Sequence, residues 1–154
     1  MKSLIYKKNG TGKLQHDAGA MAVEFALVAP IFFLILFATI ELGIYLHDRQ
    51  VLSNAAREAA RVGIVMQSPR TIPTVTPVIQ QTALNFSTTL IGVNLTCAPG
   101  GTCPEIVVAT PQGLLPGRPL TVTIITPFPF PFLSALGNLA PTISVGGIST
   151  MILE

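Results

Sequence analysis

The sequence predicts an α+β protein in which one long N-terminal helix leads into a small antiparallel-sheet domain. Two observations carry this prediction. From Phe25 to Ile40 no residue is charged, and the run is rich in Leu, Ile, Phe and Ala, which is typical of a membrane-spanning helix. In the second half of the chain, short runs of alternating apolar and polar residues are separated by Pro and Gly, which indicates strands and turns.

The apolar segment needs its flanks to cross a membrane. Phe25–Ile40 is about 16 residues, roughly 24 Å as a helix, whereas the hydrocarbon core is about 30 Å thick. Ala20–Leu46 reaches about 40 Å, so Glu24 and Glu41 are expected near the two membrane interfaces, where a carboxylate costs less than at the centre. Pro30 removes one helical hydrogen bond and predicts a bend.

The leader, which is the segment that precedes this run, is basic, since every lysine of the chain lies before Gly19. The positive-inside rule keeps such a leader in the cytoplasm and predicts a single-pass inner-membrane protein whose C-terminal domain is extracytoplasmic. A conventional secretory signal is disfavoured, since the small residues Ala18 to Ala20 precede the apolar run instead of following it. Without the leader the chain is near neutral to slightly acidic, which argues against nucleic acid as a partner.

A spaced motif joins the leader to the apolar segment. Gly19 is followed after four residues by Glu24 and Phe25, and then by the apolar run. This array resembles the processing site of type IV prepilins, in the form seen in TadE/TadG-like proteins of tight-adherence, Flp-type pilus systems. The resemblance implies that a membrane prepilin peptidase cuts between Gly19 and Ala20 and removes residues 1–19 as a leader peptide.

The chemistry of this motif suggests a role for its carboxylate. Cleavage creates a largely protonated α-amino group on Ala20, one helical turn from Glu24. Opposite charges in an apolar phase are more stable together, so Glu24 is expected to pair with that amine in its own subunit or in a neighbouring one. Glu24 and Phe25 are therefore predicted to set the register of assembly. The alternative is an uncleaved anchor whose Glu24 reaches the lipid headgroups.

Beyond the membrane the helix is predicted to continue to about residue 66, because its Ala, Arg, Glu and Gln residues favour helix. Small residues recur every four positions at Ala55, Ala59 and Gly63, a spacing that lets another helix approach closely. The two alternatives for this small-residue stripe are packing against other subunits and packing against the sheet of its own domain, and the two are compatible.

The resemblance extends through this helix. The block Gln50–Arg61 resembles the post-membrane signature of the same family, which makes the resemblance specific over about residues 19–65, and the closing Ser149–Glu154 resembles the family's common ending. The predicted organisation is a leader over 1–19, the membrane helix and its extension over 20–66, and a small pilin-like extracytoplasmic α+β domain over 67–154.

In that domain, three prolines predict a loop over Gln67–Pro77, and Thr76 with Pro77 predicts the start of a short helix over Val78–Leu90. Period-two runs of β-branched residues then predict four antiparallel strands, packed against the extended helix, at Ile91–Thr96, Glu105–Ala109, Leu120–Ile124 and Ile143–Val145.

The two cysteines, Cys97 and Cys103, bracket a turn-forming Ala-Pro-Gly-Gly-Thr insert. The cell envelope is oxidising, so we expect a disulfide that clamps a hairpin and contributes at most a few kcal/mol. A metal site is the alternative, but two thiols without a nearby His fall short of four ligands.

Proline and aromatic residues alternate from Pro127 to Leu133, a pattern that does not suit an interior strand. The prolines hold the segment extended and present Phe128, Phe130 and Phe132 along one or two faces. These rings either cap the core of their own domain or form a contact surface for a partner or for the membrane.

Catalytic residues are sparse. Outside the leader the only histidine is His47, and Asp48 beside it is expected to face the wrong way on a helix to orient it. There is no phosphate-binding loop, nucleophile elbow or metal-ligand set in the sequence, so no enzyme, metal or cofactor is expected.

The resemblance implies a minor pilin or pseudopilin, held in membrane lipid or built into the pilus, whose partners are the prepilin peptidase, other pilins and the pilus assembly platform. The competing interpretation is a permanently anchored envelope binding or scaffold protein, which uses the Cys hairpin and the aromatic segment as its contact surface.

Overall fold

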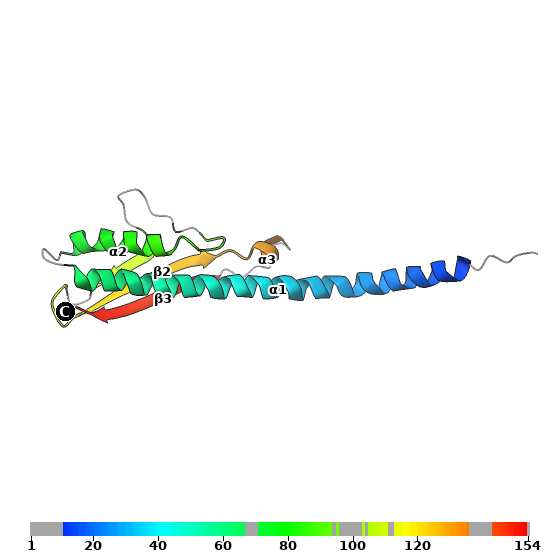
Figure 1. Ribbon diagram of the computed structural model, residues 1–154, viewed down its shortest axis with the longest axis horizontal. Coiled ribbons are helices and arrows are strands. Elements are labelled where there is room, and N and C mark those ends of the chain that lie inside the picture. The colour runs from blue at the N-terminus through cyan, green and yellow to red at the C-terminus, as the bar shows by residue number, and fades with distance from the viewer. Residues whose placement is uncertain are drawn as a thin grey trace, which may run out of the picture. The chain divides into compact units, whose positions relative to one another are not determined.

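The computed structural model describes residues 11–66, 71–93, 95, 103, 105–110, 113–135 and 143–153. Its elements in chain order are the helices and strands α1 (Thr11–Val65), α2 (Ile72–Phe86), β1 (Ile106–Ala109), β2 (Pro119–Phe128), α3 (Pro131–Ala135) and β3 (Ile143–Ile152) (Figure 1). The chain divides into two compact units, Met1–Thr39 and Ile40–Glu154. The predicted α+β class, with a long helix leading into a small antiparallel sheet, is confirmed.

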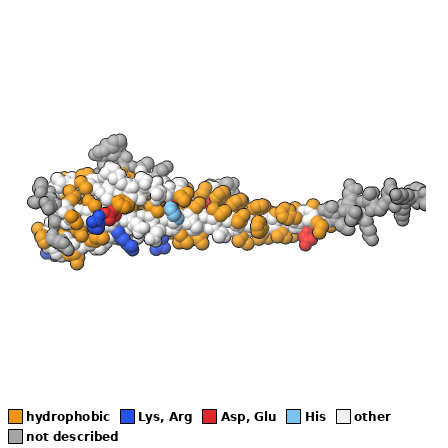
Figure 2. Space-filling model, in the orientation of Figure 1, with side chains coloured by type: hydrophobic (Ala, Val, Ile, Leu, Met, Phe, Trp, Pro, Cys, Tyr) orange, Lys and Arg blue, Asp and Glu red, His pale blue; other side chains and the backbone are white. Residues whose placement is uncertain are grey.

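The N-terminal unit contains the apolar part of α1. Its large apolar side chains are exposed, including Phe25 and Leu27, and Figure 2 shows hydrophobic side chains along this part of the helix. Pro30 lies inside the helix, and the hydroxyl of Thr39 donates a hydrogen bond of 2.8 Å to the carbonyl of Ile35. The helix is long and apolar enough to cross a membrane, and its most apolar stretch is not buried within the chain.

The C-terminal unit is built around a three-stranded antiparallel sheet with the order β1-β2-β3. Three of the predicted strands are confirmed, and two of them are longer than predicted. The middle strand β2 pairs with β3 along its whole length, from Pro119 opposite Ile152 to Phe128 opposite Ile143. The side chains of β2 alternate between buried and half-buried from Leu120 to Ile124, as a sheet with one covered face requires.

The strand predicted at Ile91–Thr96 is wrong for the described residues. Ile91 and Gly92 form a bend, and Val93 and Leu95 lie outside any strand, while residues 94 and 96 are not among the described ones. Gly92 has φ of 76°, in the left-handed region, which interrupts an extended run. In this loop Val93 is buried and Leu95 is half-buried, whereas Ile91 is exposed, so the alternating pattern does not correspond to one covered face of a strand.

The second helix starts earlier and ends earlier than predicted. Thr71 is the N-cap of α2, and its backbone N–H donates to the hydroxyl of Thr74 at 3.1 Å. Pro73 lies in the first turn, where the missing N–H is not needed, and Pro77 lies inside the helix. The predicted loop over residues 67–77 is therefore wrong for residues 72–77, and residues 67–70 lie outside the described part of the chain.

The aromatic segment also begins differently from the prediction, because Pro127 and Phe128 belong to the middle strand. The reason is the shortness of β1, whose partners on β2 run only from Thr121 to Ile124. Among the residues that the structure describes, Pro127 of β2 is paired on one side only, opposite Ser144 of β3. A proline is tolerated there because that stretch of β2 is locally an edge.

The core of the C-terminal unit lies between α1, α2 and the sheet. A Cβ at Gly63 of α1 would meet Ile79 of α2 and Leu120 of β2, each at 2.6 Å, so the glycine lets these elements approach closely. Further buried positions come from all three layers, namely Leu52, Ala55, Ala56, Ala59, Ala60, Val75, Ala83, Val122, Ile124 and Val145.

Candidate functional site

The predicted processing motif lies on the exposed surface of α1. Gly19, Ala20, Glu24 and Phe25 are all exposed and helical, and a Cβ at Gly19 would meet nothing within 4 Å. The motif is therefore open to a second protein from several directions. Its cleavage and the pairing of Glu24 with a new amino terminus stay predictions.

Two carboxylates further along α1 are buried instead. Glu41 is 1% exposed and Asp48 is 0% exposed, although the sequence placed the first at a membrane interface and assigned the second no partner. They are seven residues apart, which is two helical turns, and so they lie on one face of α1. Both are inside the C-terminal unit.

Each of these carboxylates holds a distant piece of backbone. One oxygen of Glu41 accepts a hydrogen bond from the backbone N–H of Phe132 in the first turn of α3. One oxygen of Asp48 accepts a bond of 3.0 Å from the backbone N–H of Ile91, in the loop after α2. A buried carboxylate needs such donors, and bonds to a charged acceptor are stronger than neutral ones. The helix α1 thus fixes α3 and the loop after α2 through two acidic side chains.

The contact between His47 and Asp48 corrects a prediction. The sequence suggested that Asp48 faces the wrong way to orient the histidine, yet His47 Nδ1 lies 3.2 Å from Asp48 Oδ1. The flexible side chains bridge the angle between adjacent helical positions. The same Asp48 oxygen also accepts the backbone bond, and Asp48 Oδ2 is buried without a hydrogen-bond partner among the described residues. This arrangement suits anchoring rather than catalysis.

A sequence signal for the buried carboxylates existed. Glu41, Tyr45, Asp48, Leu52 and Ala55 follow one another at spacings of four, three, four and three residues. This is the repeat of a helix face that packs along its whole length, so the two acidic residues continue the stripe that ends in buried alanines. The pattern was missed because charged residues are not normally counted as part of a buried helix face.

The small-residue stripe lies inside the chain. Ala55 and Ala59 are fully buried, and Gly63 is buried between α2 and β2. This is the second of the two alternatives, in which the stripe covers its own domain. Packing of this stripe against another subunit would require the C-terminal unit to open.

The three phenylalanines of the aromatic segment have different environments. Phe128 is buried, with its ring edge-to-face against Tyr45 of α1 at 5.4 Å and against Phe130 at 5.0 Å. Phe130 is half-buried, whereas Phe132 is 38% exposed. The first ring therefore belongs to the core, and only the last lies on the surface.

Of the two cysteines, Cys103 is buried and takes part in a disulfide. Cys97 lies outside the described residues, so its pairing with Cys103 stays a prediction. Within the part of the chain that the structure describes, no three His, Cys, Asp or Glu side chains come together as a metal site would require.

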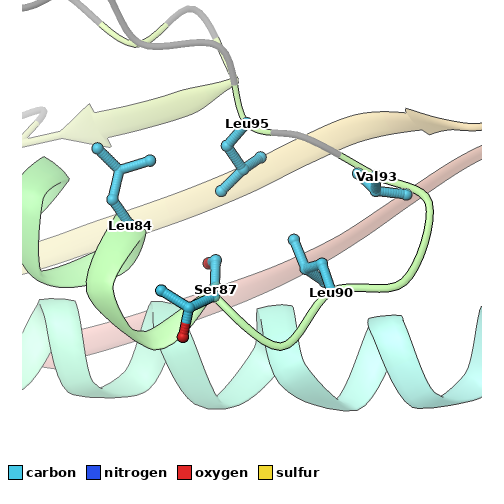
Figure 3. Close-up of a pocket in the computed structure, with 6 residues that line it drawn as sticks. Leu84, Ser87, Leu90, Val93 and Leu95 are labelled. Atoms are coloured by element: carbon cyan, nitrogen blue, oxygen red, sulfur yellow. The ribbon is translucent and has the colours of Figure 1, made fainter.

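A cavity of about 190 Å³ lies between the end of α2 and the loop that follows it (Figure 3). Its lining is mostly aliphatic, and the hydroxyl of Ser87 is already used in a bond of 2.7 Å to the carbonyl of Ala83. The volume is below the roughly 300 Å³ at which ligand pockets usually begin. The cavity is lined by Leu84, Ser87, Thr88, Leu90, Val93 and Leu95.

The comparison with known families agrees with the resemblance found in the sequence. A family model described as TadE-like protein matches residues 19–61. The match begins at the glycine of the processing motif, covers the apolar helix and both buried carboxylates, and ends at Arg61 of the surface pair with Glu58. No curated protein and no solved structure matches the chain.

Proposed function

We propose that this chain, which is TadE-like over residues 19–61, is a membrane-anchored minor pilin or pseudopilin of a tight-adherence, Flp-type pilus or a related envelope assembly. The observation that carries the proposal is the family match, which starts at the Gly19 motif and continues through the exposed apolar helix. The role is structural rather than catalytic.

The proposed pathway starts in the inner membrane, with the lysine-rich leader in the cytoplasm and the C-terminal unit outside. A prepilin peptidase removes residues 1–19, which leaves a positive amino group on Ala20. Glu24 is exposed on α1, so its carboxylate can reach the amine of its own chain or of a neighbouring pilin. Extraction from the membrane by the assembly platform then places the subunit in, or at the tip of, the filament.

Buried contacts hold the C-terminal unit to α1. The buried bonds of Glu41 and Asp48 fix α3 and the loop after α2 to α1, and Cys103 adds a covalent link. We propose that Cys97 is the partner of Cys103, and that the unit initiates, caps or decorates the filament.

The test is the identity of the amino terminus. The chain is expressed with its cognate prepilin peptidase and, as a control, with a catalytically inactive peptidase, and the intact mass is measured. A chain that begins at Ala20 only in the first case supports the proposal. A chain that keeps Met1 beside an active peptidase rejects it in favour of a permanently anchored envelope scaffold.

The register role of Glu24 is tested separately. Glu24→Ala is expected to insert into the membrane normally and to enter the assembly poorly, because the new amino terminus loses its counter-charge. Glu58→Ala, which removes a half-buried carboxylate at the surface of the same helix, serves as the matched control. Equal incorporation of both variants would rule out the register role.

A further inference from the structure

The buried position of Glu41 changes how much of α1 a membrane can cover. In the sequence the charge-free run stops at Ile40, after about 16 residues or roughly 24 Å. Because Glu41 is buried, the exposed surface of α1 after Glu24 carries no ionisable carboxylate or base until His47 and Arg49. The uncharged surface from Phe25 to Leu46 is about 22 residues, roughly 33 Å, which matches a hydrocarbon core of about 30 Å.

The element that covers Glu41 is α3. Its residue Phe132 donates its backbone N–H to the carboxylate, so the charged group is bonded within the protein instead of facing outward. This short helix is itself uncharged, and the sequence contains no charged residue from Pro119 to Leu153. An uncharged cover over an acidic residue suits a place that is poor in water, because an exposed carboxylate would resist entering it.

The surface around this cover is apolar. Leu42 and Leu46 of α1 are exposed, Phe132 of α3 is 38% exposed, and Ile143 at the start of β3 is exposed. Ile143 is placed at the same end of the unit because its partner across the sheet is Phe128, whose ring contacts Tyr45 of α1.

We propose that these four side chains, Leu42, Leu46, Phe132 and Ile143, form a lipid-facing collar at the end of the C-terminal unit. The interfacial layer of the membrane rests against the collar, and α3 masks Glu41 beneath it. The proposal rests on the membrane anchoring in the proposed function and adds where the anchor stops and which folded elements touch lipid.

The occupant is a lipid surface rather than another protein because the collar continues the membrane-capable helix. Leu42 and Leu46 follow directly on an exposed apolar run that is long enough to span a bilayer. Apolar and aromatic side chains without charge are the type found at the boundary between acyl chains and headgroups. A collar docked on a second subunit is the competing outcome, and it gives a different signal in the test below.

The chain contains no tryptophan, so single Trp substitutions report depth without background. The full-length protein is placed in phosphatidylcholine vesicles whose acyl chains are brominated either near the headgroup or near the chain end. Phe132→Trp and Ile143→Trp probe the collar from two elements, so one of them remains if the other fails to fold. Phe32→Trp reports whether the helix is inserted. Ile152→Trp is the matched control, because it is exposed on the same strand as Ile143 and roughly 30 Å along it.

The expected result is that shallow bromines quench Phe132→Trp or Ile143→Trp more strongly than deep bromines do, because these positions lie at the headgroup level. Deep bromines should quench Phe32→Trp most strongly, and neither kind should quench Ile152→Trp. If Phe132→Trp and Ile143→Trp are as little quenched as Ile152→Trp while Phe32→Trp is quenched, the collar is rejected and the membrane anchor still holds. Collar probes that are shielded from aqueous acrylamide but not quenched by bromine also overturn it, since a protein then covers them. If neither kind of bromine quenches Phe32→Trp, both the collar and the membrane anchor of the proposed function are rejected.

Discussion

Replacing Gly147 by alanine tests how β3 and α1 fit together. Gly147 lies in β3, where a Cβ would be 2.5 Å from the carbonyl oxygen of Leu52 and 2.5 Å from the backbone nitrogen of Ser53. Both atoms belong to the backbone of α1, so no side chain can rotate away. The strand and the helix would have to separate by about 1 Å to restore normal contact distances.

The magnitude follows from opposing contributions. Overpacking of this kind costs about 1–3 kcal/mol, and a clash with backbone belongs at the upper end. Changing Gly to Ala also lowers the conformational entropy of the unfolded chain, which stabilises the folded state by about 0.4–1 kcal/mol. The net loss is therefore about 2 kcal/mol, which lowers the melting temperature of a unit of this size by about 8 °C.

The assay is thermal unfolding of the full chain in detergent micelles, followed by circular dichroism. Gly43→Ala is the matched control, because a Cβ at Gly43 meets nothing within 4 Å and alanine favours helix by about 0.5–1 kcal/mol. It should leave the melting temperature unchanged or raise it. If Gly147→Ala melts within about 2 °C of the parent protein, the close approach of β3 to α1 is not a determinant of stability.

Three further predictions concern side chains. Asp48→Ala should cost about 1.5–3 kcal/mol by removing the acceptor of a backbone bond, whereas Asp48→Asn, which keeps an acceptor and removes a buried charge, should be as stable as the parent in urea titrations. Phe128→Ala should lower the free energy of unfolding by about 3–5 kcal/mol and Phe132→Ala by less than about 1 kcal/mol, because only the first ring is buried. Similar losses for the two variants in the same titrations would contradict this difference in burial. The hydrogen bond from Arg61 lowers the pKa of Glu58, so that pair stabilises the fold above the usual carboxyl range and loses its effect as the pH falls through the lowered pKa. Because the pair is exposed, Glu58→Gln should shift the melting temperature at pH 7 by less than about 2 °C, and a larger shift would show that the pair is shielded from water.

The residues of the candidate site differ in how far the sequence could predict them. The Gly19, Glu24 and Phe25 motif depends on spacing along one helix, and the structure leaves it on the helix surface. The roles of Glu41 and Asp48 depend on the backbone of Phe132 and Ile91, which are 91 and 43 residues away. A local pattern cannot show which distant segment will contact a carboxylate, so the sequence alone placed Glu41 at a membrane interface and suggested no partner for Asp48.

The sequence by itself determined the long helix and three of the strands, because an uncharged apolar run and a period-two alternation can be recognised from neighbouring residues alone. The tertiary structure alone decided that Pro127 can belong to the middle strand, since this depends on where β1 ends. It also decided that the alanine stripe is enclosed by its own domain and that a glycine is needed where β3 meets α1. Burial is a property of pairs of segments, and the partner of each segment is known only once the chain has folded.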